Sequence, residues 1–523
     1  VVVQFCCQLL IIKDFKLRQR QRNTTNRILW RDRYLTCVKD FKESLYLSKI
    51  NACKEFFSSL DRNNIWKSAY RFWKNPSMTN QTLTTIKKDD DTCTILPIDT
   101  ANYLLDKFFP NLSHDLDDPI HAWYCSSCLT ENDLLITDKE VDYAIKVEND
   151  AKSPGYDAIS ANIIKSIHSL FPSFLKSLFN KCLFFANFPK CWKKSIVKLI
   201  PKNIGNSYRP ISLLPVLGKI FEGIIARRLQ HFLLSNSKLS YVQFGFLPQK
   251  STELALFSLV DKMKRVFDNK SFAFMVSLDI KGAFDSARYD IILQRLRNFE
   301  IPPNIYAVIV DYFKDRIVEL PLLNVMVSKR VTGGCPQGGK ISPLLWNVLL
   351  DDLLKLPLPS NCFLQAYADD TILFCEHRSI ENCAFLTNNA LQIIEQWGLN
   401  NGLVFNPMKT QAMMVTKRRN FVLPDLFLNG HMINIVRCIK ILGVLIDSKL
   451  TWNDHISYIK SKAMKIYNLI RWKHGSNWGL SFDVLRTIYL QAIEPIILYA
   501  CPVWSDILNC STKCCSLLSL QRC

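Results

Sequence analysis

The sequence predicts an α+β fold, with a β-rich core between two mainly helical regions. Between residues 140 and 446 helical and β-rich segments alternate, which favours a mixed fold over an all-helical one. Helical periodicity dominates residues 34–75 and returns after Trp452. At 523 residues the chain is long enough to bury several cores, so we expect three or four subdomains rather than one.

Residues 1–137 are predicted to form a basic, mainly helical N-terminal extension and linker. Basic side chains outnumber acidic ones in residues 13–33, which is typical of a solvated amphipathic helix and compatible with nucleic-acid contact. Aromatic residues at helical spacing in residues 34–75 indicate a helical core. The stretch 75–97 is polar and is predicted to be a linker.

The charge balance indicates a polyanionic partner. The chain has 66 Lys and Arg residues against 46 Asp and Glu residues, a formal net charge of +20. Attraction to phosphates explains such a charge most simply, whereas no lipidation motif or spanning helix supports a membrane partner. The apolar run at residues 1–12 is too short and too interrupted for a leader or a span. We therefore expect an intracellular protein of the nucleus and cytoplasm.

The cysteines predict free thiols. There are 19 of them and no secretory signal, which indicates a reducing compartment. His121, Cys125 and Cys128 have the spacing of metal ligands, with His114 as a fourth candidate. A second matching pair is missing nearby, so we favour structural thiols over a zinc site. The C-terminal cysteines, at positions 510, 514, 515 and 523, form no stronger motif.

An acidic hairpin is the strongest chemical signal. The run 366–374 reads as two apolar strands around a tip that carries Asp369 and Asp370. Taken alone, a solvated turn would explain this tip equally well. However, a third carboxylate, Asp279, ends another apolar and β-rich run. Carboxylates on neighbouring strand ends can hold two divalent cations about 3.5–4 Å apart, and Mg²⁺ suits such oxygen ligands.

Short motifs follow one another in order along the chain. They are Lys-Ser-Pro-Gly-Tyr-Asp (152–157), Trp-Lys-Lys (192–194), Ile-Pro-Lys (200–202), Tyr-Arg-Pro-Ile-Ser-Leu-Leu (208–214), Gln-Phe-Gly-Phe (243–246), Leu-Asp-Ile-Lys-Gly-Ala-Phe-Asp (278–285), Gly-Cys-Pro-Gln-Gly-Gly (334–339), Ser-Pro-Leu-Leu-Trp-Asn (342–347), Tyr-Ala-Asp-Asp (367–370), Gly-Leu (402–403) with Asn406, Lys409 and Thr410, and Leu-Gly-Val (442–444). This series resembles the reverse transcriptases of non-LTR (LINE-type) retrotransposons, in particular the jockey-like group of arthropods. The resemblance covers roughly residues 140–505.

The resemblance implies a right-hand polymerase fold. Fingers and a palm with an antiparallel sheet are expected at residues 138–446, with the core motifs at 192–446, and a helical, truncated thumb at 447–523. The implied function is an RNA-directed DNA polymerase that copies element RNA into cDNA from a DNA primer 3′-hydroxyl. The expected partners are an RNA template, a DNA primer and deoxynucleoside triphosphates. Because the chain resembles a partial reading frame, we expect the partner endonuclease on a missing upstream part, and no RNase H domain.

The resemblance also assigns a catalytic centre. Asp279, Asp369 and Asp370 are expected to be catalytic. Together with the backbone carbonyl of Ile280 they are expected to bind two Mg²⁺ ions, for which Mn²⁺ can substitute. A buried salt bridge is the alternative explanation for Asp279.

Six further residues are expected to contact the nucleotide: Lys202, Arg209, Phe284, Gln337, Gly338 and Lys409. The two cations at 202 and 209 would clamp the triphosphate. The ring of Phe284 would exclude a 2′-hydroxyl. Lys409 would protonate the leaving pyrophosphate, although a solvated surface lysine fits the sequence nearly as well. The neighbouring Asp285 is expected to cap a helix.

The helix predicted after Trp452 has two different faces. Its apolar stripe consists of Trp452, Ile456, Ile459, Ala463, Ile466 and Ile470. Lys460, Lys462 and Lys465 lie largely elsewhere and are predicted to bind the nucleic-acid backbone. An ordinary solvated surface helix would look similar.

Two rival functions stay open. Tyr156, Ala158 and Lys340 stand where the family usually has other residue types, which leaves a catalytically inactive, RNA-binding retrotransposon remnant as one rival. A group II intron-type reverse transcriptase is the other, because it shares the Pro-Gln-Gly-Gly and Tyr-Ala-Asp-Asp motifs. The Gln-Phe-Gly-Phe box, Trp346 and the segment 499–504 favour the retrotransposon.

Overall fold

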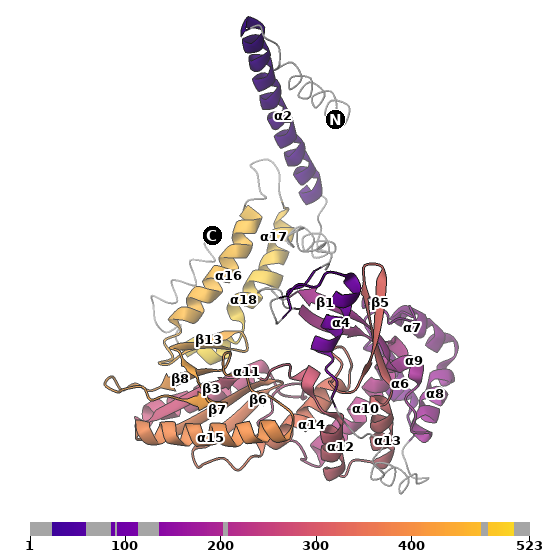
Figure 1. The fold of residues 1–523 in the computed structure, drawn as a ribbon, viewed down its shortest axis with the longest axis vertical. Helices are drawn as coiled ribbons and strands as arrows, with labels where there is room; N and C mark the ends of the chain where they lie inside the picture. Colours follow the sequence, from indigo (N-terminus) through magenta and orange to yellow (C-terminus); the bar gives the residue numbers. More distant parts are fainter. Residues whose placement is uncertain are drawn as a thin grey trace. The chain divides into compact units, whose positions relative to one another are not determined.

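The computed structural model describes residues 24–58, 85–88, 92–112, 135–201, 208–471 and 480–506 (Figure 1). The chain divides into two compact units. The larger unit comprises residues 82–455 and 502–509, and the smaller one comprises 1–81, 456–501 and 510–523. The larger unit holds both main sheets, with helices around them, which confirms the predicted α+β class.

The first sheet has four strands in the order β2–β1–β4–β5. Its members are β1 (Lys194–Pro201), β2 (Tyr208–Leu213), β4 (Arg316–Leu322) and β5 (Val325–Val331). The β1–β2 and β4–β5 pairs are antiparallel, and a parallel pairing of β1 with β4 joins the two hairpins. Helix α4 (Pro97–Phe108) buries Leu104 and Leu105 in one apolar cluster with Val318 and Leu320 of β4.

The segment before α4 differs from the predicted polar linker. Ile86 is buried, and its backbone N–H donates to the hydroxyl of Thr94 at 2.9 Å. Thr94 is buried as well and accepts at 2.7 Å from the hydroxyl of Thr100 in α4. These polar side chains therefore satisfy one another inside the fold rather than facing solvent.

The second sheet has five strands in the order β11–β8–β3–β7–β6. Its members are β3 (Phe272–Leu278), β6 (Cys362–Tyr367), β7 (Asp370–His377), β8 (Gln411–Val415) and β11 (Asn434–Ile435). Strand β3 runs antiparallel to both of its neighbours, and all its residues except Ser277 are buried. Apolar packing therefore fixes the strand, and a carboxylate that follows it lies at the strand's end.

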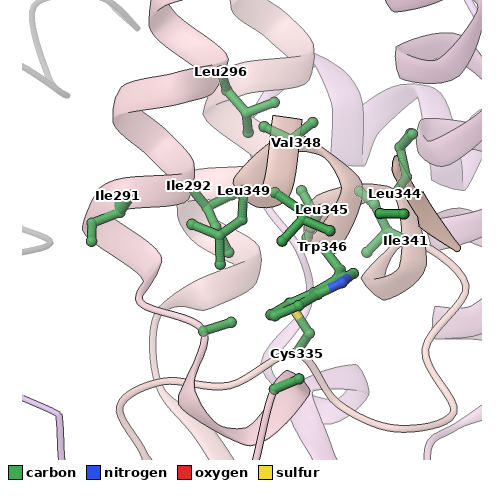
Figure 2. Packing of buried hydrophobic residues seen from close by; sticks show 14 of the residues in the cluster. Ile291, Ile292, Leu296, Cys335, Ile341, Leu344, Leu345, Trp346, Val348 and Leu349 are labelled. Carbon is green, nitrogen blue, oxygen red and sulfur yellow. The ribbon is translucent and has the colours of Figure 1, made fainter. Parts of the chain in front are cut away.

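Helices cover this sheet. Helix α15 (Ile380–Asn400) contacts β3, β6 and β7 and lies along the sheet in Figure 1. Helix α14 (Ser342–Leu354) packs against α12 (Tyr289–Asn298), and Figure 2 shows Val348 and Leu349 of α14 meeting Ile292 and Leu296 of α12. The other helices in this part of the chain are α10 (Val216–Ser235), α11 (Thr252–Asp268) and α13 (Pro303–Phe313).

Between α4 and β1, the described residues form the helices α6 (Asp138–Lys146), α7 (Ala161–Leu170), α8 (Pro172–Phe184) and α9 (Lys190–Lys193). Helix α6 begins with a capping box, in which Thr137 and Glu140 satisfy each other's backbone N–H groups. The ring of Phe179 in α8 stacks on Phe221 of α10, with 5.5 Å between centroids. These contacts join the segment to the main apolar core.

Two small hairpins follow α15. They are built from β9 (Phe427–Leu428) with β10 (His431–Met432), and from β12 (Cys438–Ile441) with β13 (Val444–Asp447). The chain then enters α16 (Asn453–Arg471), where Ile456, Ile459 and Ala463 are buried, as the apolar stripe predicts.

The smaller unit is helical in its described part. It contains α2 (Thr24–Ser58), most of α16, α17 (Phe482–Ile488), the π-helical turn η3 (Tyr489–Ile493) and α18 (Glu494–Leu498), and α19 (Cys501–Trp504) follows. Helix α2 confirms the predicted helical character as far as residue 58. The predicted helical core is wrong at Tyr46, which is 65% exposed. No helix in the described part of the chain combines the length and the apolar character needed to cross a membrane.

Candidate active site

The first candidate carboxylate follows directly after β3. The backbone N–H of Asp279 donates to the hydroxyl of Thr410 at 3.3 Å, and its carbonyl accepts from the N–H of Asn406 at 2.8 Å. Ile280 forms a β-bridge with Phe405. The two hydrogen bonds of this bridge are made by the residues that flank Ile280 and Phe405, so the carbonyl of Ile280 takes no part in them. The strand end is therefore fixed by the 404–410 loop.

The second and third carboxylates lie in the β6–β7 hairpin. Tyr367 pairs with Asp370, which leaves Ala368 and Asp369 as a two-residue turn. The predicted hairpin is thus confirmed. Leu278 of β3 pairs with Thr371 of β7, so Asp279 and Asp370 are the next residues and lie at the same end of these two strands.

The carboxylates affect one another electrostatically. The pKa of Asp370 is raised from 3.8 to about 6, first by desolvation and then by the negative charges of Asp369 and Asp279. The Nζ of Lys409 lies 3.7 Å from Oδ2 of Asp279 and offers a partial counter-charge. Repulsion among the carboxylates means that a cation would stabilise their ionised forms.

The donor set fits Mg²⁺ in its chemistry. The groups are hard oxygen donors, and Mg²⁺ commonly takes only one or two protein carboxylates, completing its shell with water and substrate phosphates. In the described ranges, no three His, Cys, Asp or Glu side chains are gathered closely enough to hold a metal ion by themselves. An ion at Asp279 and Asp369 would thus complete its shell with water in the free chain, and with phosphate oxygens once a nucleotide is bound.

A single cavity of about 770 Å³ collects most of the predicted site residues. Asp279, Ile280 and Asp369 line it on the side of the second sheet. The third predicted carboxylate, Asp370, is exposed at the start of β7 and is not among the lining residues. The predicted nucleotide contacts that line it are Arg209, Phe284, Gln337, Gly338 and Lys409. The remaining one, Lys202, lies outside the described residues. Residues scattered over 200 positions of sequence are therefore brought to one opening.

The loop 336–339 owes its shape to glycine. Gly338 has φ +123°, and a Cβ there would lie 2.7 Å from the carbonyl oxygen of Ser212. The carbonyl of Gln337 accepts from the N–H of Ser212 at 2.9 Å, which ties the loop to β2. The Gln337 side chain donates to Oδ1 of Asp285 at 3.1 Å.

That contact corrects one expectation. Asp285 lies inside the short 3₁₀ helix Phe284–Ser286, where no side chain makes a capping hydrogen bond to the backbone. It instead orients the amide of Gln337 beside the cavity. Phe284, one residue earlier, stacks on Trp346 with 5.2 Å between ring centroids and meets Phe246 edge-on at 6.4 Å. Its ring is thus both a wall of the cavity and part of the packing.

Two cavity residues were missed from the sequence. Lys107 and Phe108, at the end of α4, line the same cavity although they belong to the predicted N-terminal extension. No periodicity or spacing connects them with Asp279. The apolar and aromatic end of the helix can be recognised in the sequence. Its position beside the cavity, however, depends on how α4 packs on β4 and β5.

Lys340 also has a clear structural partner. Its ammonium group forms an ion pair with Glu148, whose side chain is 4% exposed, and its backbone N–H donates to Glu222 at 2.7 Å. The lysine at position 340, which departs from the family pattern, therefore has a buried carboxylate as its partner. By itself this departure is no sign that the chain has lost its function.

The remaining candidates lie elsewhere. Lys460 is half-buried, while Lys462 and Lys465 are exposed, and the Nζ of Lys462 lies 4.5 Å from the centroid of the Tyr458 ring. All three lysines belong to the smaller unit. The zinc candidates His114, His121, Cys125 and Cys128, the C-terminal cysteines and the side chains of residues 13–33 lie outside the described residues.

A cavity lined by carboxylates at the strand ends of a mainly antiparallel sheet, with Arg209 and a Gln-Gly-Gly loop at the same opening, fits the two-metal phosphoryl-transfer enzymes, a class that includes the polymerases. In agreement, residues 200–446 match the family described as reverse transcriptase (RNA-dependent DNA polymerase). The chain thus contains a reverse transcriptase domain.

The relatives specify the group. The chain is 26% identical over 93% of its length to the "Retrovirus-related Pol polyprotein from type-1 retrotransposable element R1" of Bradysia coprophila. It is 29% identical over 70% of its length to the "Putative 115 kDa protein in type-1 retrotransposable element R1DM", and 29% identical over 68% to the "RNA-directed DNA polymerase from mobile element jockey", both of Drosophila melanogaster.

These matches confirm the predicted resemblance to the reverse transcriptases of non-LTR retrotransposons of insects. They span 48%, 36% and 40% of the respective relatives' own lengths, so the chain corresponds to half of these proteins or less.

Proposed function

We propose that this chain is an RNA-directed DNA polymerase that extends a DNA primer along an RNA template. The observation that carries the proposal is the lining of one cavity by Asp279, Asp369, Arg209 and Gln337 in a chain with a reverse transcriptase domain. The reaction is attack of the primer 3′-hydroxyl on the α-phosphate of a deoxynucleoside triphosphate, with pyrophosphate as the leaving group.

In this proposal, Asp279, Asp369 and the Ile280 carbonyl hold two Mg²⁺ ions, and Mn²⁺ can replace them. Bound metal would lower the pKa of the attacking hydroxyl and neutralise charge on the phosphates. Asp370 shares the site's negative charge, as its raised pKa indicates. Since the pKa of Asp370 is about 6, this group is mostly ionised at pH 7 and adds to the attraction for cations.

The nucleotide would occupy the other walls of the cavity. Arg209 is exposed at the opening, where its guanidinium could pair bidentately with phosphate oxygens, and Lys202 would add a point charge. Phe284 would close the space beside the sugar. Lys409, through its ion pair with Asp279, stands where it could also donate a proton to the departing pyrophosphate.

The larger unit would form the fingers and palm of a right-hand polymerase, and α16 its thumb. Lys460, Lys462 and Lys465 would then bind the phosphate backbone of the primer–template. The formal net charge of +20 supports a polyanionic partner for the chain as a whole. Because the relatives are roughly twice as long or more, an endonuclease on another part of the element is the proposed partner for making the primer end.

The test is primer extension with purified chain, Mg²⁺, deoxynucleotides and a DNA primer annealed to RNA. Labelled extension product should appear only when the primer is annealed to the RNA template and the metal ion is present. The rival, an inactive RNA-binding remnant, would bind the primer–template without extending it under any metal condition. Extension that instead required intron RNA structure would favour the group II intron-type alternative.

A further inference from the structure

A buried segment holds the turn that carries Asp369. Residues 242–244 lie alongside β6, the edge strand of the second sheet, through a parallel bridge between Gln243 and Ala366. The N–H of Ala366 donates to the carbonyl of Val242 at 3.1 Å, and the carbonyl of Ala366 accepts from Phe244 at 2.8 Å. The segment therefore extends the sheet at the strand that leads into the turn.

The side chain of Gln243 reaches the turn itself. It is 2% exposed, and its Oε1 accepts two backbone hydrogen bonds, from Gly245 at 2.9 Å and from Ala368 at 3.2 Å. Ala368 has φ +59°, a left-handed conformation that is unfavourable for a residue with a Cβ. The amide of Gln243 thus supports a strained residue directly before Asp369.

Gly245 completes this support. A Cβ at Gly245 would lie 2.2 Å from the backbone nitrogen of Ala368, so only glycine permits so close an approach. The Gly245 carbonyl accepts at 2.9 Å from the side chain of Asn347, which is 1% exposed and belongs to α14. The turn is therefore braced against a buried helix through Gln243 and Gly245.

We propose that Gln243 is a positioning residue for Asp369, which holds the 368–369 turn in the conformation that binds divalent cations. This inference rests on the proposed function, since it assumes that Asp369 is a metal ligand. The hydrogen bond crosses 125 residues of sequence and reaches a backbone N–H one residue from the ligand. Partners of this kind typically change metal affinity by roughly 10- to 100-fold when they are removed.

Gln243→Met tests the proposal, because it keeps the length of the side chain but removes the accepting oxygen. Gln365→Met is the matched control. Gln365 is also 2% exposed and lies on β6, but its amide donates to the carbonyl of Ala255 in α11 rather than to the turn. Both substitutions remove a buried polar contact and should lower Tm similarly.

The readout is Mn²⁺ binding without substrate, which is monitored through the electron paramagnetic resonance signal of the free ion. The binding that is lost in Asp369→Asn defines the fraction of bound Mn²⁺ that is specific to the site. Gln243→Met should weaken this binding about 10-fold or more, while Gln365→Met leaves it unchanged. Gln243→Glu retains an accepting oxygen and should bind at least as tightly as the native chain. If Gln243→Met is not folded at the assay temperature, Gln243→Asn, one methylene too short to reach Ala368, takes its place.

Three outcomes decide the matter. Equal Mn²⁺ affinity for the native chain and Gln243→Met would overturn the positioning role while leaving the polymerase proposal intact. Equal weakening by Gln243→Met and Gln365→Met would also overturn it, since the effect would then be a general loosening of the core. Absence of any Asp369-dependent binding in the native chain would contradict both the positioning role and the metal assignment of the proposed function.

Discussion

At the scale of single residues, the site depends on a few groups whose surroundings set their chemistry. Phe284 illustrates this, because one ring lines the cavity and also stacks on Trp346. The orientation of the ring in the cavity is thus fixed by packing. If a nucleotide binds there as proposed, a ring held in this way would exclude a single extra oxygen by sterics.

Phe284→Ala should raise the incorporation of ribonucleotides relative to deoxynucleotides by about 10-fold or more. The substitution removes the ring that would occupy the space of a 2′-hydroxyl. It should also destabilise the chain by less than the ~3–5 kcal/mol of a fully buried Phe, because Phe284 is only partly buried. Single-nucleotide insertion assays measure the ratio, and Phe284→Tyr, which keeps the ring, is the control. An unchanged ratio in Phe284→Ala would place the sugar gate at another residue.

Asp370 gives a pH-dependent prediction. Its folded-state pKa of about 6 lies above the ordinary 3.8, so its contribution favours folding below pH 4 and is lost as the pH rises through 6. Asp370→Asn should therefore raise the metal-free Tm at pH 7–8 and have little effect near pH 3.5. Melting curves across this range check the sign. A gain in Tm at low pH and none at high pH would contradict the assigned cause.

At the scale of elements, the loop 336–339 is held from two sides. Gly338 packs on β2, while Lys340 pairs with Glu148 in the segment that follows α6. Elements far apart in sequence thus meet at one loop. The Lys340–Glu148 pair is mostly buried, and breaking such a pair is costly because it leaves one charge without compensation.

Lys340→Met should lower Tm by a few degrees or more, because Glu148 would remain buried without its ion-pair partner, with only the charge of Lys219 still nearby. The double variant Glu148→Gln/Lys340→Met should recover much of the loss, since neither charge remains. A double-mutant cycle by thermal unfolding measures this coupling. Strictly additive losses would show that the two side chains do not interact in solution.

At the scale of the whole molecule, the basic residues should determine how nucleic acid is held. Changing Lys460, Lys462 and Lys465 to Ala should flatten the salt dependence of primer–template binding, by nearly one unit of log–log slope for each duplex phosphate that is no longer neutralised. It should also shorten the products, with little effect on single-nucleotide insertion once substrate is bound.

The control for this prediction is the triple variant Lys139→Ala, Lys146→Ala and Lys181→Ala, which removes three exposed lysines from α6 and α8. It makes the same change in net charge. The assignment of α16 as the thumb would be contradicted if the α16 variant kept the native salt dependence of primer–template binding. It would also be contradicted if both triple variants decreased the slope of this dependence equally.

The sequence was sufficient for features that depend on local pattern. The acidic hairpin could be predicted because apolar strands flank Asp369 and Asp370, and the stripe on α16 because burial follows helical spacing. The pairing of β1 with β4 and the arrival of Lys107 at the cavity could not be predicted, because they depend on packing between distant segments. The hydrogen bond from Ala368 to Gln243 was hidden for the same reason.

The most direct measurement of the central claim is Mg²⁺-dependent extension of a DNA primer on an RNA template by the purified native chain and by Asp369→Asn. The substitution keeps the shape of the side chain but removes a charged ligand at the cavity. We predict extension by the native chain, none detectable by Asp369→Asn, and equal primer–template binding by both. Extension by Asp369→Asn at the native rate would contradict the assigned active site.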